Sequence, residues 1–387
     1  MITDGPSYLA LLLFIASAIV WIEHKSRAKL FEYLPSIVII YFVVMLLATF
    51  GLWQKTDAIT TTYKSLKTLL LPAMIFLMLL LADMRQILRL GRKMLLTFVL
   101  ASVSIGIGFV VMFALFHTHF APQSWKAFAA LSGSWMGGTG NMVAIQGALN
   151  VPDSKMGYAL LIDSVDYAIW VMILLALVPF AKRFNRWVKA DTAIIDEVGQ
   201  KLALSSSQRG APDFPSLFFL LGTALIVSAL STQAAALMPV TDFLTQTTWT
   251  VIFATLAGII MAMTPLAKLP GSQELGNIML YTIVALIASR ASFAELTQAP
   301  LYIVAGFVII IVHVLIMVLF AKLFKLDLFS LGVASLANIG GVASAPILAS
   351  AYSKALIPIG VLMAMLGYIV GTFGGLLVGK ILQIISP

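Results

Sequence analysis

The stretch Ser132-Gly-Ser-Trp-Met-Gly-Gly-Thr-Gly-Asn-Met-Val-Ala-Ile-Gln146 interrupts a strongly apolar chain. It holds four glycines within eight residues, and the segment Leu160-Leu-Ile-Asp-Ser-Val-Asp166 then adds two carboxylates three residues apart. Glycine destabilises helices, and a carboxylate inside a bilayer is costly unless it has partners. We therefore expect the functional chemistry of the protein between Ser132 and Asp166.

The composition indicates a polytopic membrane protein. The chain has 387 residues, of which 61% are hydrophobic and only 10% are charged, whereas a soluble domain carries about 25% charged residues. The net charge of +8 needs no nucleic acid to explain it, because Lys and Arg collect in the loops. The absence of cysteine excludes disulfides and thiolate metal sites. The first residues lack a basic region, so we expect no cleaved signal peptide.

Ten apolar segments are long enough to span a bilayer or nearly so. They cover residues 8–22, 35–52, 66–81, 94–116, 157–180, 217–237, 249–263, 275–288, 301–320 and 357–378. Two further segments, 125–149 and 327–352, are apolar but broken by small and polar residues.

The order of the segments divides the chain into two repeats. Residues 1–180 form the first transmembrane repeat, residues 181–214 a polar cytoplasmic linker, and residues 215–387 the second repeat. Each repeat carries one broken segment between two long spans, with Gly137-Gly-Thr-Gly-Asn141 in the first and Asn338-Ile-Gly-Gly341 in the second. Matching interrupted segments in two halves are typical of a transporter's binding site. We expect Pro346 to end one half-helix of the second broken segment.

The distribution of basic residues distinguishes two topologies. If all twelve segments cross the membrane with the N-terminus outside, only 10 of the 24 Lys and Arg residues lie inside, against the positive-inside rule. If the broken segments enter and return, 17 of the 24 lie inside. We therefore expect an all-α protein with two inverted repeats of five spans, each with a re-entrant or discontinuous Gly-rich helix. The choice between hairpins and crossing discontinuous helices stays open.

The two Gly-rich tips are the candidate binding elements. Helix ends within the membrane expose amides that favour anions and carbonyls that favour cations. The alternative is that the small residues only let helices pack closely. We expect substrate contacts from Ser134, Gly137, Gly138, Gly140, Gln146, Gly340, Gly341 and Ser344, and ion contacts from Thr139, Asn141 and Asn338.

Asp163 and Asp166 lie at positions i and i+3, which share one helix face. They suit a sodium site or a proton acceptor; otherwise they line a water-filled vestibule or stand at a helix end. His313 lies in mid-span, where a lone buried histidine is more often structural than a proton relay. The chain has no Walker A loop, no nucleophile elbow and no zinc-ligand spacing, so we expect no enzyme, no cofactor and no metal beyond sodium.

The run Gly133-Ser-Trp-Met-Gly-Gly-Thr-Gly-Asn-Met-Val-Ala144, followed by Asp163 in Leu-Ile-Asp-Ser-Val, resembles the DUF819 family of membrane proteins. More distantly it resembles the cation:proton antiporter and anion transporter group, which includes the sodium–glutamate and sodium–citrate symporters. The resemblance implies inverted repeats, core and scaffold domains, two Gly-rich broken helices meeting near mid-membrane, and usually a homodimer. It also makes Asp163 the better ion-site candidate. The second tip departs from the symporter pattern, and the two acids are not adjacent as they are in the antiporters.

We therefore expect a secondary active transporter of the bacterial inner membrane, with its N-terminus outside. Sodium or protons would drive symport of a small organic anion or zwitterion by alternating access. The alternative is a monovalent cation/proton antiporter that uses Asp163 and Asp166.

Overall fold

The computed structural model describes residues 1–26, 35–190, 210–293 and 296–386, and every secondary-structure element in these ranges is helical. Residues 191–209 of the expected linker lie outside them. Seven helical stretches are long and apolar enough to cross a membrane. Their main helices are α1 (Gly5–Lys25), α4 (Asp57–Leu79), α6 (Gly91–Phe116), α9 (Asp153–Leu177), α12 (Phe214–Ala236), α15 (Ala299–Phe324) and α18 (Ile357–Ile385). Shorter helices are α3 (Ser36–Thr49), α5 (Met84–Ile87), α10 (Ala181–Val188), α13 (Gln246–Met261) and α14 (Ser272–Ala288).

Polar caps set where several of these helices begin. The side chains of Asp4, Thr56, Asp213 and Asp327 each accept a hydrogen bond from a backbone amide in the first turn of α1, α4, α12 and the later helix α16. Such caps satisfy amides that have no partner within the helix. Because of its cap, α4 begins well before the apolar segment 66–81.

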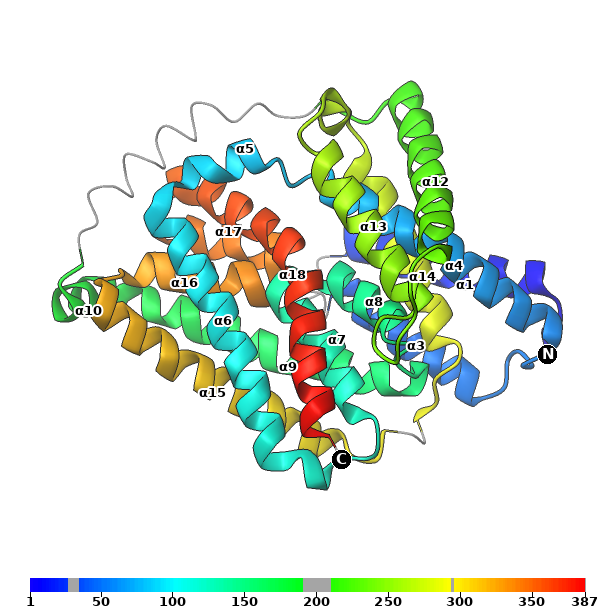
Figure 1. Ribbon diagram of the computed structural model, residues 1–387, viewed down its shortest axis with the longest axis horizontal. Helices are drawn as coiled ribbons and strands as arrows, with labels where there is room; N and C mark the ends of the chain where they lie inside the picture. The colour runs from blue at the N-terminus through cyan, green and yellow to red at the C-terminus, as the bar shows by residue number, and fades with distance from the viewer. Residues whose placement is uncertain (27–34, 191–209, 294–295, 387) are drawn as a thin grey trace.

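The helices form two groups that lie side by side, as Figure 1 shows. The hairpin group contains α6, α7, α9 and α15 to α18, and the flanking group contains α1, α3, α4, α12, α13 and α14. Helix α8 lies between them, since it packs against α7 and α18 on one side and α4 and α13 on the other.

The first broken segment is a helical hairpin made of α7 (Ser124–Gly137) and α8 (Thr139–Ala148). They join at Gly138, whose φ of 87° is readily adopted only by glycine. A Cβ at Gly133 would meet the side chain of Ile145 and lie 3.3 Å from the carbonyl oxygen of Asn141. In a continuous helix, residues 133 and 145 would lie about 18 Å apart. The second helix therefore folds back along the first.

The second broken segment repeats this arrangement with α16 (Leu328–Ile339) and α17 (Gly341–Tyr352). Gly341 has a φ of 61°, and a Cβ at Gly332 would lie 3.0 Å from Cδ2 of Leu348. The prediction that Pro346 ends a half-helix was wrong, because Pro346 lies inside α17. Helix α18 packs so closely here that a Cβ at Gly360 would lie 2.7 Å from the Ala345 carbonyl oxygen. Packing thus holds the helix through a proline that removes one backbone hydrogen bond.

The two hairpins start from opposite ends of α6. At the C-terminal end, the first hairpin begins at Ser124, whose Oγ accepts a 2.7 Å hydrogen bond from Tyr302 at the start of α15. At the N-terminal end, Lys93 forms a 3.1 Å ion pair with Asp327, the cap of α16. A helix of 26 residues is about 39 Å long, so the two tips approach each other from opposite ends of the bundle.

Close approach of α18 to the first tip generates a stability prediction. A Cβ at Gly371 would lie 2.7 Å from Cα of Gly137 and 2.8 Å from the side chain of Asn141. We expect Gly371→Ala to lower the free energy of unfolding by about 1–3 kcal/mol, because the backbones must separate. The measurement is thermal unfolding of the purified protein in detergent.

Gly222 of α12 is the matched control, because nothing lies within 4 Å of a Cβ placed there. Gly222→Ala should leave stability unchanged or raise it by up to about 1 kcal/mol. Equal unfolding temperatures for the two variants would contradict this packing.

Candidate functional site

A cavity of about 320 Å³ lies where the two hairpin tips meet. The first tip contributes Gly138, Thr139 and Gly140, and the second contributes Gly340 and Gly341. The lining also contains the polar side chains of Ser134, Asp163, Ser164, Tyr167, Gln273, Asn277, Tyr281 and Tyr368. Apolar residues, among them Pro35, Ile37, Val38, Met78 and Leu280, form the rest. Two elements separated by about 200 residues therefore line one cavity that contains several polar side chains.

The N-terminal ends of two helices face this cavity. Helix α8 begins at Thr139 and helix α17 begins at Gly341, and both residues line the cavity. The amides of a first helical turn have no partner within their own helix, and the helix dipole makes that end positive. The described lining contains no Lys, Arg or His, so the positive charge that it can offer an anion comes from these two helix ends. The arrangement suits a small anionic group.

Asp163 supplies the carboxylate of the cavity. It lies on α9 and accepts a 3.0 Å hydrogen bond from the hydroxyl of Ser134 on α7. Thr139 lines the same cavity. Carboxylate and hydroxyl oxygens are ligands that a hard cation prefers. The site thus offers a place for a cation next to one for an anion.

Asp166 has different surroundings. It is fully buried, and neither carboxylate oxygen has a hydrogen-bond partner among the described residues. A Cβ at Gly306 of α15 would overlap its carboxylate, so Asp166 lies at the contact between α9 and α15. It is not among the residues that line the cavity. The i, i+3 spacing predicted that the two acids share one helix face. In the structure they have different neighbours: Asp163 lines the cavity, whereas Asp166 packs against α15.

Asn141 and Asn338 lie beside the tips, with their side chains bonded to other parts of the protein. Asn141 donates to the Gly137 carbonyl at 2.6 Å and accepts from Thr372 of α18 at 2.6 Å. Asn338 donates to the Ala334 carbonyl at 2.9 Å and accepts from Ser102 of α6 at 2.7 Å. Neither lines the main cavity. In this geometry they hold the ends of the breaks in place.

The remaining predicted residues fall into four places. Gly137 packs against α18, and the Ser344 hydroxyl lies 3.4 Å from the Leu336 carbonyl oxygen inside the second hairpin. His313 is buried between the hydroxyls of Ser104, at 2.7 Å, and Ser335, at 2.9 Å. Both ring nitrogens of His313 therefore have a hydrogen-bond partner, and the residue does not line the cavity. Gln146 belongs to a separate polar cluster.

The sequence analysis missed the polar stripe of α14. Gln273, Asn277 and Tyr281 all line the cavity and stand at positions i, i+4 and i+8, on one helix face. Gln273 lies before the expected apolar segment 275–288, and Asn277 and Tyr281 lie within it, where hydropathy alone indicates a membrane span. Tyr167 and Tyr368 were also missed, since tyrosines in spans are common and carry little positional information.

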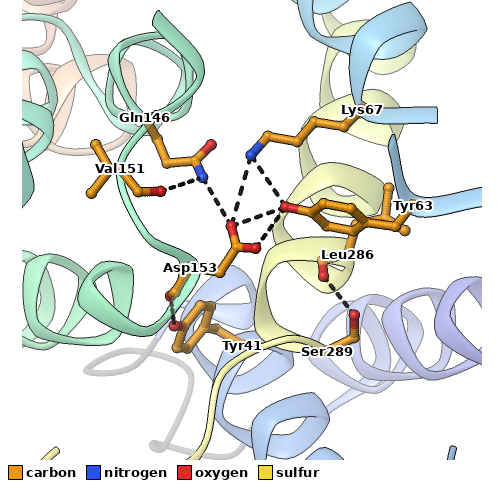
Figure 2. Close-up of polar contacts among 8 residues, drawn as sticks. All are labelled: Tyr41, Tyr63, Lys67, Gln146, Val151, Asp153, Leu286 and Ser289. Atoms are coloured by element: carbon orange, nitrogen blue, oxygen red, sulfur yellow. Dashed lines mark hydrogen bonds and ion pairs between the residues drawn. The ribbon is translucent and has the colours of Figure 1, made fainter. Parts of the chain in front are cut away.

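The separate polar cluster joins the two helix groups around Asp153, the first residue of α9. Figure 2 shows Tyr63, Lys67 and Gln146 converging on its carboxylate. Tyr63 donates at 2.8 and 2.9 Å, Gln146 donates at 3.0 Å, and the Lys67 ammonium lies at 3.7 Å. Tyr41 donates to the backbone carbonyl of Asp153 at 3.2 Å. We call Tyr63, Lys67, Gln146 and Asp153 the Asp153 cluster.

The Asp153 cluster and the cavity lie toward opposite ends of the flanking helices. The cavity is lined by Gln273 and Asn277 in the first turns of α14 and by Met78 near the end of α4. The cluster takes Lys67 from an earlier part of α4, and the ring of its Tyr63 lies 5.4 Å from the guanidinium of Arg290, just beyond the other end of α14. Polar bonds thus join the hairpin and flanking groups at the end away from the cavity.

Breaking this junction should destabilise the protein. We expect Asp153→Asn to lower the free energy of unfolding by about 1–3 kcal/mol, because it leaves the Lys67 ammonium, only 19% exposed, without its ion partner. Arg85→Gln is the control, because it breaks an ion pair with Asp83 in which the Arg85 side chain is 58% exposed. That loss should stay within about 0.5 kcal/mol. Equal losses, measured by thermal unfolding, would contradict a structural role for the cluster.

Comparison with known proteins supports the assignment of the apolar helices to a membrane protein. Residues 10–385 match the family described as "Protein of unknown function (DUF819)". The chain is 26% identical over 335 residues to "Uncharacterized membrane protein YjcL" of Bacillus subtilis (strain 168), covering 82% of this chain and 83% of that protein. The family match extends over nearly the whole chain. The protein is therefore an integral membrane protein that belongs to the DUF819 family.

Proposed function

We propose that this protein is a secondary active transporter that couples a sodium ion or a proton to the movement of a small organic anion or zwitterion. The observation that carries the proposal is the meeting of two hairpin tips, one from each half of the chain, in a single polar cavity. Broken helices that present their ends to one site near the middle of the bundle are typical of such transporters.

The arrangement of the hairpins supports inverted repeats. Each hairpin follows one long helix and precedes another, α6 and α9 in the first half and α15 and α18 in the second. The two hairpins start at opposite ends of α6. Two repeats with the same helix order and opposite direction would produce this pattern.

The cavity and the Asp153 cluster suggest how access alternates. The cavity extends toward the end of the bundle where α4 ends and α14 begins, which the charge distribution assigns to the cytoplasm. At the other end, the bonds of Asp153 to Tyr63 and Lys67 hold the hairpin group against the flanking group. Outward opening would break those bonds and close the flanking helices over the tips.

Within the cavity we assign the charges as follows. The first turns of α8 and α17 bind the anionic part of the substrate, because the positive ends of both helices lie at the cavity. Asp163 binds the coupling ion, with the hydroxyls of Ser134 and Thr139 beside it. The stripe of Gln273, Asn277 and Tyr281 then faces the substrate from α14.

Asp166 favours a second candidate function, cation/proton antiport. An acid that is fully buried and has no partner among the described residues can exchange a proton without disturbing other bonds. Asp163 would then bind the cation in the cavity. This alternative predicts cation/proton exchange with no organic substrate present.

Transport by reconstituted protein tests the proposal. Proteoliposomes with an inward sodium or proton gradient are offered a labelled panel of carboxylates and amino acids. We expect gradient-driven uptake of at least one member. Asp163→Asn should slow that uptake by about tenfold or more, the effect of losing one charge-assisted ligand.

Asp242→Asn is the control, because Asp242 is an exposed loop acid, and its uptake should equal that of the original protein. Unchanged uptake by Asp163→Asn would remove Asp163 from the ion site. Sodium-driven pH changes inside the vesicles without any organic solute, and no uptake of the panel, would replace symport with antiport.

A further inference from the structure

Helices α9 and α15 are in close contact around Gly306 and move apart toward their C-terminal ends. At Gly306 a Cβ would overlap Asp166 and the side chain of Ile162, so the helices are in close contact there. Further along α9 and α15, a groove of about 280 Å³ opens between them, with α16 as its floor. Its lining is almost entirely apolar and includes Leu174, Leu177, Phe180, Val314, Met317 and Leu331. It shares no residue with the cavity at the hairpin tips.

The groove faces away from the protein. Its innermost residues are buried, with Leu174 of α9 5%, Met317 of α15 4% and Leu331 of α16 6% exposed. Its rim residues Leu177 and Phe180 are 37% and 56% exposed. All five lie on helices apolar enough to span a membrane or on the second hairpin. A groove with a buried apolar floor and an exposed apolar rim, set in a transmembrane surface, fits a hydrocarbon chain.

A short basic helix lies at one end of the groove. Phe184 of α10 lines it, while Lys182, Arg183 and Arg186 of the same helix are exposed. The helix is therefore apolar toward the groove and cationic elsewhere, as in helices that lie at a membrane surface.

Hydrogen bonds fix α10 in this position. Asn185 accepts a 2.9 Å hydrogen bond from the backbone amide of Leu328 at the start of α16. Lys322 near the end of α15 donates a 2.7 Å hydrogen bond to the backbone carbonyl of Trp187. Helix α10, with its three exposed basic side chains, is thus fixed at the end of the groove.

We propose that this groove binds an anionic phospholipid, with an acyl chain between α9 and α15 and its phosphate among Lys182, Arg183 and Arg186. The apolar groove selects a chain, and the three basic residues of α10 select a negatively charged head group over a zwitterionic one. This proposal does not depend on the transport function, because the groove is separate from the cavity.

Native mass spectrometry of the purified full-length protein tests this site. The protein is titrated in detergent with dioleoyl phosphatidylglycerol and, separately, with dioleoyl phosphatidylcholine. We expect phosphatidylglycerol to bind at least about fivefold more tightly, the contribution of one basic residue near a membrane surface. Free glycerol 1-phosphate, which has the head group without the chains, should not compete.

Two variants separate the head-group and chain contacts. Lys182→Gln/Arg183→Gln/Arg186→Gln should reduce the preference to less than about twofold. Val318→Trp, which fills the groove without changing charge, should weaken binding of both lipids.

Matched controls are available for both variants. Arg89→Gln/Arg92→Gln/Lys354→Gln removes three exposed basic residues that do not lie on α10 or line the groove. Leu319→Trp adds a ring at a 55% exposed position outside the groove. Both should retain the original binding. Equal affinity for the two lipids in the original protein, or equal losses in the variants and their controls, would overturn the proposal.

Discussion

A helix that ends within a packed apolar bundle leaves backbone groups without partners, and the rest of this structure depends on how that constraint is met. Gly138 and Gly341 permit the two breaks through their positive φ. At the first break, the side chain of Asn141 bonds to the Gly137 carbonyl, and Thr372 of α18 holds Asn141 in turn. The amides of the next helix then face the cavity. Two helix N-terminal ends therefore lie at the cavity, beside the carboxylate of Asp163.

The same constraint explains the close packing of the hairpin group. The second helix of each hairpin returns beside the first, so both need small residues at the contact, such as Gly133 and Gly332. Helix α18 approaches at Gly371 and Gly360 and touches the backbone of both hairpins. The flanking group meets the hairpin group through polar bonds at Asp153 at one end, while a cavity separates them at the other. The proposed alternating access rests on two features. The hairpins are closely packed by α18, and the hairpin and flanking groups are joined by polar bonds at Asp153 that can be broken and re-formed.

Much of the fold could be predicted because glycine and charge carry strong signals in an apolar chain. The two breaks followed from their glycines, and the helical class followed from the hydropathy. The start of α4 was missed because the cap at Thr56 and its polar first turns outweigh hydropathy there. The i, i+3 spacing predicted that Asp163 and Asp166 share a face, but a difference of about 60° around the helix gives the two side chains different neighbours. Contacts between distant segments, such as that of α14 with the tips, have no local signature.

The central claim is that the two hairpins enter the membrane from opposite sides. The chain contains no cysteine, so single cysteines can be labelled with a membrane-impermeant maleimide in intact cells and again after permeabilisation. Thr118→Cys and Ser154→Cys flank the first hairpin, and Ser353→Cys follows the second. We predict that residues 118 and 154 react in intact cells and that residue 353 reacts only after permeabilisation. Labelling of 118 and 154 from different sides, or of all three from the same side, would contradict the account.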